Sequence, residues 1–259
     1  MLGKLATPLG GIGDFVALGV DSARELFHRP FQWRETVEQS WAIARVSMVP
    51  TLLVAIPFTV LVSFTLNILL REIGAQDLSG AGAALGTITQ IGPIVTVLIV
   101  AGAGATAICA DLGARTIREE IDAMKVLGIN PIHRLVVPRI IASTGVAVLL
   151  NSLVCTIGIG GGFVFSVYLQ DVNPGAFIAN LTLLTGFGEL MISMVKAALF
   201  GLFAGMVGCY QGLNVKGGAK GVGDAVNETV VYSFMALFVV NVVVLSLIHI
   251  SEPTRLGMI

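Results

Sequence analysis

Long runs of uncharged residues alternate with short charged segments along the chain. Five runs are almost free of Asp, Glu, Lys and Arg, and they cover residues 46–70, 79–110, 140–170, 190–212 and 229–248. Only Lys196 interrupts them. An α-helix rises about 1.5 Å per residue, so about 20 residues cross the roughly 30 Å hydrocarbon core of a bilayer. The pattern predicts an all-α membrane protein with five transmembrane helices in a domain over residues 46–248.

The first 45 residues carry a different pattern. Within 13–29, Val16, Val20 and Phe27 recur at helical spacing opposite charged residues, and 33–44 repeats the pattern with two tryptophans. Both segments are too polar to span a bilayer, and amphipathic helices rich in aromatic residues favour the headgroup region. Residues 1–45 are therefore predicted to form interfacial helices on the cytoplasmic side, with a soluble helix pair as the alternative.

Composition and charge support this interpretation and give it an orientation. Charged residues make up 12% of the chain, about half the roughly 25% that is usual in soluble domains. A cytoplasmic N-terminus would put twelve Lys and Arg residues in cytoplasmic segments and only two, Arg71 and Arg255, in outer segments. Because cytoplasmic loops carry the excess of Lys and Arg, this distribution predicts that the N-terminus is cytoplasmic.

The cytoplasmic loop between the second and third runs holds a short amphipathic segment. Ile117, Ile121, Met124 and Leu127 share one helical face, with charged residues opposite them. Gly128, followed by Asn-Pro, is a natural end for a helix. We expect a helix over 116–128, which either rests on the membrane surface or docks a cytoplasmic partner.

The sequence lacks the signatures of the common catalytic and nucleotide sites. It contains no GxxxxGK[ST] phosphate loop, no HExxH and no GxSxG, and its three cysteines lie in apolar runs without metal-type spacing. We therefore expect a protein that is not an enzyme and has no metal site or nucleic-acid partner. An ion-coupled secondary transporter is an alternative, but such proteins use carboxylates inside the membrane, and the runs contain none.

Several short blocks carry a resemblance to a known family. They comprise Gly92-Pro93, Ala110-Asp111-Leu112-Gly113, 119–124, 127–131, Val137-Pro138-Arg139, 217–223 and 227–231. In this order they resemble the MlaE/YrbE permease family, whose members work with MCE proteins in bacterial lipid transport. The resemblance covers about residues 25 to 245 and implies an inner-membrane permease subunit of an ABC-type lipid transporter.

Within that family the chain looks most like actinobacterial YrbE A-type subunits. The segments that carry this likeness are 29–32, 105–109 and 172–177. They point to the branch that imports sterols, with branches for fatty or mycolic acids next. Gln90 and Ala103 stand where proteobacterial relatives carry a carboxylate and an arginine, which disfavours a phospholipid cargo. The tail 249–259 does not resemble the family.

The resemblance also implies partners and sites. A separate ATPase would supply ATP-driven motion, so no cofactor is expected on this chain, and a second permease (as a heterodimer) and periplasmic MCE proteins would complete the assembly. The ATPase would contact the loop helix through Arg118, Glu119, Glu120, Ile121, Asp122, Met124 and Leu127. Of these, Ile121, Met124 and Leu127 would fill a groove of the ATPase. The lipid would lie beside Phe58, Leu61, Phe64, Thr65, Asn67 and Gln90.

Lys196 stands alone as an ionisable residue inside an uncharged run. Such residues are costly in a membrane and are functional candidates by default. The side chain lies about 12 Å from the outer end of its run if that run is helical. Extension of the long side chain to the outer interface is an equally open expectation.

Overall fold

The computed structural model describes residues 6–28 and 31–251, and this part of the chain consists of helices joined by turns and short loops, without strands. Five stretches are long and apolar enough to cross a membrane, which confirms the predicted number of spans. They are Trp33–Glu72, Gln76–Ile117, Ile132–Gln170, Phe187–Leu213 and Gly218–Val243. The α-helices are α1 (Ala6–Glu25), α2 (Trp33–Glu72), α3 (Ser79–Gly86), α4 (Gly92–Ile99), α5 (Thr106–Ile117), α6 (Glu120–Val126), α7 (Val137–Gln170), α8 (Pro174–Asn180), α9 (Phe187–Leu213) and α10 (Gly218–Ser251).

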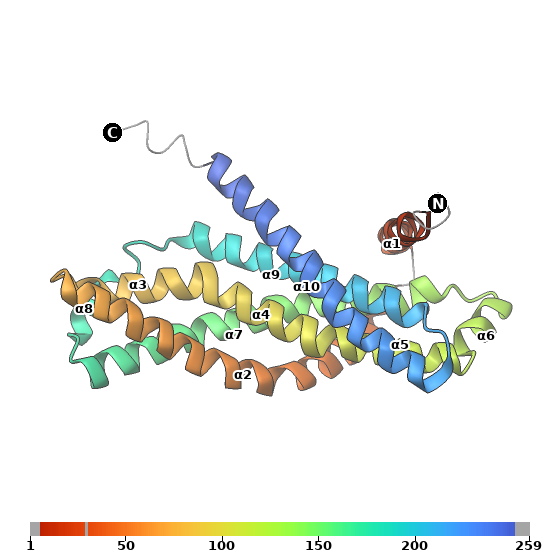
Figure 1. Cartoon of the computed structure of the whole chain (residues 1–259), viewed down its shortest axis with the longest axis horizontal. Helices are drawn as coiled ribbons and strands as arrows, with labels where there is room; N and C mark the ends of the chain where they lie inside the picture. The colour runs from red at the N-terminus through yellow and green to blue at the C-terminus, as the bar shows by residue number, and fades with distance from the viewer. Residues whose placement is uncertain (1–5, 29–30, 252–259) are drawn as a thin grey trace.

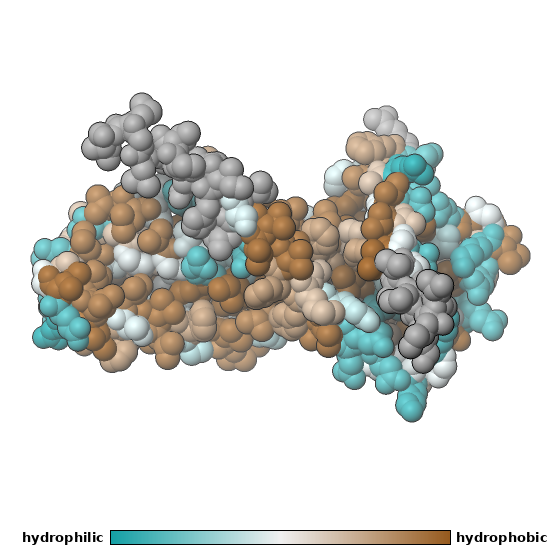
Figure 2. Space-filling model, turned by 45° about the horizontal axis from the view of Figure 1, so that its top comes forward, coloured by the Kyte–Doolittle hydropathy of each residue, from teal (hydrophilic) through white to brown (hydrophobic). Residues whose placement is uncertain are grey.

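The spans run lengthwise through an elongated bundle, with α6 at one end and α8 at the other (Figure 1). A broad apolar zone covers the middle of the visible face in Figure 2, and hydrophilic residues gather most densely at the end that carries α6. This division is what a bilayer requires of a protein that crosses it, because charged side chains are costly in the hydrocarbon region.

The second span is a chain of helical segments rather than one regular helix. Helices α3, α4 and α5 are joined end to end by π-helical turns over Thr87–Ile91 and Val100–Ala105. Pro93 is the second residue after the first turn, and proline cannot donate the usual backbone hydrogen bond. Single π-turns inside helices are frequent at functional sites, which makes the segment around Gln90 a place to search for one.

The first span begins earlier than the sequence pattern predicted. Helix α2 runs without interruption for 40 residues, so residues 33–44 are the beginning of this span and not a separate interfacial helix. Pro50 and Pro57 lie inside the helix and do not break it. At about 1.5 Å per residue, α2 is about 60 Å long and must extend well beyond a bilayer core of about 30 Å.

Glycines bring the middle parts of the spans close together. A Cβ atom added to Gly158 of α7 would lie 2.5 Å from Cγ2 of Thr87, and one added to Gly208 of α9 would lie 2.6 Å from the carbonyl oxygen of Ala105. Small residues allow membrane helices to approach in this way. The second and third spans pack extensively against other helices, since 56% and 44% of their most apolar stretches are buried.

The first and last spans lie at the outside of the bundle. Only 22% of the most apolar 18-residue stretch is buried in Trp33–Glu72, and only 17% in Gly218–Val243. Helix α10 begins at Gly218 and continues to Ser251, so the first three residues of the predicted tail 249–259 are helical. The rest of that tail lies outside the described residues.

Helix α1 is amphipathic, as expected, and lies beside the end of the bundle that carries α6 (Figure 1). Val16 and Val20 are exposed, whereas Leu18 is buried against the bundle. Two hydrogen-bonding contacts hold the end of this helix, one from Asn130 Nδ2 to Glu25 Oε1 at 3.0 Å and one between His133 Nδ1 and the Glu25 carbonyl at 3.2 Å. The helix is thus tied to the segment that precedes α7.

Candidate functional site

The loop helix is shorter than the sequence predicted. Thr116 and Ile117 belong to α5, and α6 begins only at Glu120 and ends at Val126. The break lies at Glu119, whose backbone adopts a left-handed conformation with φ of 59°. Gly128, with φ of 75°, ends the segment as expected, and the Ile129 N–H donates back to the Met124 carbonyl at 2.9 Å.

The apolar face of α6 points toward its own chain. Ile121 is 6% exposed and joins the main hydrophobic core, against which Met124 also packs. Ile121 is therefore occupied by its own chain, whereas Met124 is half-buried and its contact with an ATPase stays a prediction. Leu127 remains available at 74% exposure, and Val126, which the sequence did not single out, is 87% exposed. A seven-residue helix is only marginally stable alone, so part of its apolar surface anchors it.

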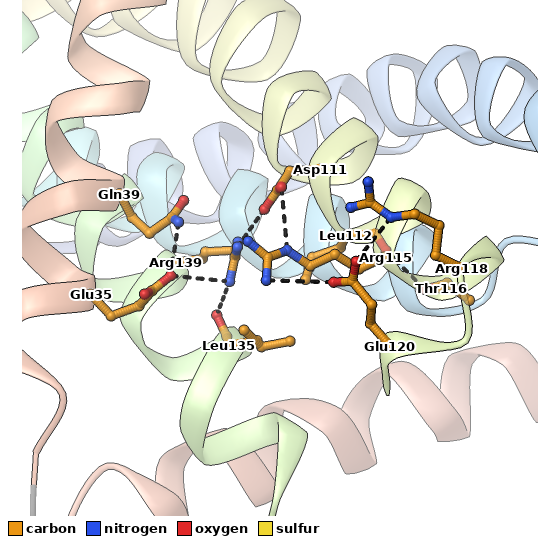
Figure 3. Close-up of polar contacts among 10 residues, drawn as sticks. All are labelled: Glu35, Gln39, Asp111, Leu112, Arg115, Thr116, Arg118, Glu120, Leu135 and Arg139. Carbon is orange, nitrogen blue, oxygen red and sulfur yellow. Dashed lines mark hydrogen bonds and ion pairs between the residues drawn. The ribbon is translucent and has the colours of Figure 1, made fainter. Parts of the chain in front are cut away.

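A fully buried arginine lies behind α6, near the start of α7 (Figure 3). Arg139 is bonded to the carboxylate of Asp111 on α5 and donates from Nη1 to the Leu135 carbonyl at 2.9 Å. Its Nη1 also lies 3.9 Å from Oε1 of Glu35 on α2. One guanidinium thus joins three spans, and its Nε finds no partner among the described residues.

A second arginine extends this cluster to α6 (Figure 3). Arg115 Nε lies 3.4 Å from Asp111 Oδ1, and Arg115 Nη1 lies 3.9 Å from Glu120 Oε2. Glu120 also accepts a 2.9 Å contact from Arg118. We call Glu35, Asp111, Arg115, Glu120 and Arg139 the ionic cluster. It connects α6 to spans α2, α5 and α7 without a gap.

The sequence prediction found Glu120 in this cluster but missed the other four members. One signal was present, since Asp111 and Arg139 are the first charged residues beyond the uncharged runs 79–110 and 140–170. Two opposite charges at the ends of consecutive antiparallel spans lie at the same membrane face and can pair. The pairing with Glu35 depends on the packing of α2 against α7, which the sequence pattern does not contain.

The remaining predicted docking residues lie on the surface. Lys125 Nζ binds Asp122 Oδ1 at 2.9 Å, an exposed pair within α6. Glu119 is exposed at the turn, and its carboxylate has no partner in the part of the chain that the structure describes. Glu119, Asp122 and Leu127 are therefore open to a partner, whereas Glu120 is already engaged in the ionic cluster.

The predicted lipid-contacting residues do not share one cavity. Phe64 and Asn67 line a pocket of ≈ 260 Å³ between α2, the start of α3 and the end of α7, together with Arg71 and Asp171. Asn67 is buried and donates to Ser166 Oγ at 2.7 Å. Gln90 lines a different pocket, and Phe58, Leu61 and Thr65 line neither, being exposed on α2. The sequence pattern assigns these residues to the first and second spans but does not tell which neighbouring helix they face.

Lys196 is enclosed in the bundle at 5% exposure, so its side chain does not extend to the outer surface. It lies one turn from Ser193, which accepts a 2.9 Å hydrogen bond from Asn151 of α7. Among the described residues it has no ion-pair partner. The structure thus removes the snorkelling alternative and leaves an ionisable group buried in the span.

The chain was compared with models of known protein families, and the result agrees with five spans and a small helix between the second and third. A family model described as permease MlaE matches residues 36–247. The chain belongs to the MlaE permease family. As a member, it is a multi-pass membrane protein and a permease subunit, and the match covers four spans in full and all but the first three residues of Trp33–Glu72.

Relatives in other organisms agree with this assignment. A probable ABC transporter permease protein of Synechocystis is 33% identical over 210 residues, which cover 80% of this chain and 79% of that protein. The Arabidopsis protein TRIGALACTOSYLDIACYLGLYCEROL 1, chloroplastic, is 27% identical over 83% of this chain and 61% of its own length. A probable ABC transporter permease protein of Rickettsia typhi is 31% identical over 61% of each chain. The chain is therefore a transporter subunit and not an enzyme, and an ABC permease works with an ATPase partner.

The ionic cluster leads to a prediction about stability. Replacing Arg139 by Met should lower the free energy of unfolding by roughly 1–3 kcal/mol, because two partly exposed carboxylates, Asp111 and Glu35, lose the buried charge between them. The measurement is thermal unfolding of the purified full chain in detergent. Arg34→Met is the matched control, since Arg34 forms an exposed pair with Glu38 at 3.0 Å, and such pairs contribute little. Equal unfolding temperatures for the two variants would contradict the assigned role of Arg139.

Proposed function

We propose that this chain is the permease subunit of an ATP-driven MCE lipid transporter in a bacterial inner membrane. The observation that carries the proposal is the ionic cluster, which joins a small surface helix to three spans in a member of the MlaE permease family. A transporter of this kind needs a rigid path between the surface that meets the ATPase and the helices that must move. The chain offers one such path.

The ATPase would contact α6 at Glu119, Asp122, Val126 and Leu127. Closure of the ATPase would displace α6, and Glu120 would carry the displacement to Arg115 on α5. Asp111 and Arg139 continue the path to α7, and Glu35 continues it to α2. Charge-assisted contacts are strong and directional, so they transmit a displacement better than apolar contacts that can slide.

The cargo we propose is a weakly polar lipid, with a sterol favoured and a fatty or mycolic acid next. Gln90 and Ala103 leave the second span without the charged groups that would pair with a phospholipid head. The likeness to actinobacterial YrbE A-type subunits supports the same choice. A lipid cargo also agrees with the Arabidopsis relative, which is named after a galactolipid.

The assembly would contain a second permease and periplasmic MCE proteins. We favour a heterodimer of two related permeases because the A-type likeness implies a differing partner. An ion-coupled secondary transporter is the competing function. It lacks support in the relatives, which are ABC permeases, and in the uncharged runs, which contain no carboxylate for a coupling ion.

Orientation is the first part of the proposal to test. A cytoplasmic N-terminus and a cytoplasmic α6 put Lys125 inside the cell and Asp171, at the opposite end of the bundle, outside it. In a cysteine-substituted series, Asp171→Cys should react with a membrane-impermeant maleimide in intact cells. Lys125→Cys should react only after the membrane is opened. Labelling of both positions from outside would contradict the orientation.

Docking through α6 leads to the second test. Glu119→Lys and Leu127→Asp change exposed side chains, so the permease should still fold and accumulate in the membrane. Each should lower recovery of the ATPase by about tenfold or more, because a mismatched charge at an interface easily costs over 1.4 kcal/mol. The measurement is co-purification of the ATPase with the tagged permease.

Glu38→Lys on α2 is the matched control, because it reverses another exposed glutamate. It should recover the ATPase in full. Met124→Asp is unsuitable as a test, since Met124 packs against the core of its own chain. Full recovery of the ATPase by both α6 variants would place the docking surface elsewhere.

The cargo leads to the third test. Cells that lack this gene should lose uptake of labelled cholesterol to a greater extent than uptake of labelled palmitate. Restoring the gene should return cholesterol uptake. The reverse order of losses would move the assignment to the fatty or mycolic acid branch, while leaving the role as a lipid permease in place.

A further inference from the structure

Lys196 is the one Lys, Arg, Asp or Glu inside the five uncharged runs, and the structure leaves its ammonium group uncompensated. The side chain is enclosed in the bundle. Neither an ion pair nor a hydrogen bond holds its nitrogen in the part of the chain that the structure describes. An ionisable group inside a membrane span is costly, and such groups usually pair with another charge. A counter-charge for Lys196 is therefore to be sought.

The chain itself offers no carboxylate at this depth. At about 1.5 Å per residue, Lys196 lies about 13 Å along α9 from Phe187, where the helix starts. The nearest carboxylate on the helix, that of Glu189, accepts a hydrogen bond from the Gly186 N–H at 2.8 Å and so caps the helix. The uncharged runs contain no Asp or Glu, so a second copy of this chain would bring none into the membrane interior either. The counter-charge has to come from a different molecule.

The first half of α9 presents a surface that can receive another helix. Ile192 is 40% and Val195 58% exposed, and nothing lies within 4 Å of a Cβ atom added to the exposed Gly188. We call these three residues the α9 face. Small residues let membrane helices approach closely, and Gly188 gives the α9 face room for such an approach.

Lys196 lies at the edge of the α9 face, one turn after Ile192. The Cα–Cβ bond of a helical residue tilts toward the start of the helix. The side chain of Lys196 is therefore directed toward the exposed turn at Ile192 and away from Phe200, which is buried one turn later. A helix packed on the α9 face would bring its side chains next to the ammonium group.

We propose that the α9 face packs against a transmembrane helix of the second permease, and that this helix carries an Asp or Glu that pairs with Lys196. The proposal rests on the proposed function, and it specifies a chemical property of the second permease. The carboxylate accepts hydrogen bonds from the ammonium group, and charge-assisted bonds of this kind are strong. An identical copy has no such carboxylate, so the pair requires a heterodimer.

The same lysine disfavours the wrong assembly. Two copies of this chain that met at their α9 faces would enclose two ammonium groups without a counter-charge. A buried charge without a partner is strongly destabilising, and a penalty against one partner contributes to specificity for another. Lys196 thus favours the non-identical pair in two ways, by attraction in that pair and by repulsion in the identical one.

The test uses membranes of cells that hold the tagged full chain with its native partners. Dicyclohexylcarbodiimide enters the bilayer and activates a carboxylate, and an adjacent amine then displaces the urea and forms an amide bond. Mass spectrometry of the purified complex should find Lys196 joined to an Asp or Glu within a span of the second permease. Lys125 and Asp122, which lie 2.9 Å apart on α6, are the internal positive control for the reagent.

Variants separate the charge from the cross-link. Lys196→Arg keeps the charge but offers no amine, so the cross-link should vanish while the second permease still co-purifies. Lys196→Met should lower recovery of the second permease by about tenfold or more, because the carboxylate of the partner is left unpaired in the membrane. Lys220→Met is the matched control, since Lys220 is exposed near the start of α10, and recovery should stay full.

The contrary outcomes are equally specific. A link from Lys196 to a fatty acid, to a carboxylate of this same chain or to another subunit would overturn the pairing. So would the absence of a link at Lys196 while Lys125 and Asp122 are joined, or full recovery of the second permease by Lys196→Met. ATPase recovery is measured on the same preparations. If the ATPase is recovered while the pairing fails, the role as an ABC permease stands and only the inference about Lys196 is lost.

Discussion

The buried guanidinium of Arg139 holds the end of the bundle that carries α6. A charge enclosed in a protein that has few charges must be compensated, because burial without a partner is costly. Asp111 and Glu35 provide that compensation from α5 and α2, so the requirement of one side chain fixes the relative positions of three spans. Arg115 then adds α6 to the same arrangement through Glu120.

The middle of the bundle is held by a different means. No ion pair lies there among the described residues, and the spans instead approach through glycines such as Gly158 and Gly208. Close backbone packing stabilises helices in lipid, where the hydrophobic effect no longer drives them together. The structure therefore combines polar contacts at one end with tight apolar packing in the membrane.

The sequence predicted the features that depend only on whether a segment is surrounded by water or by lipid. Uncharged runs identify spans because every residue in them must tolerate lipid, and the structure confirms five. The first residue of α6 was harder to predict from the sequence, since the turn at Glu119 forms where Arg115 and Arg118 meet Glu120. The direction in which each side chain faces was the hardest feature to predict. Lipid and protein interior are both apolar, so the pattern could not tell that Ala55 is buried while Leu61, on the same helix, is exposed.

Helices α2 and α7 are joined near both of their ends. Glu35 meets Arg139 at one end, and Asn67 bonds to Ser166 at the other, while Gly158 brings α7 against Thr59 between them. Two helices that are bonded near both ends cannot slide along each other. Their easiest shared motion is a tilt about the contact in the middle. A push applied beside α6 would then appear, with reversed direction, at the pocket lined by Phe64 and Asn67 near the other end of these two helices.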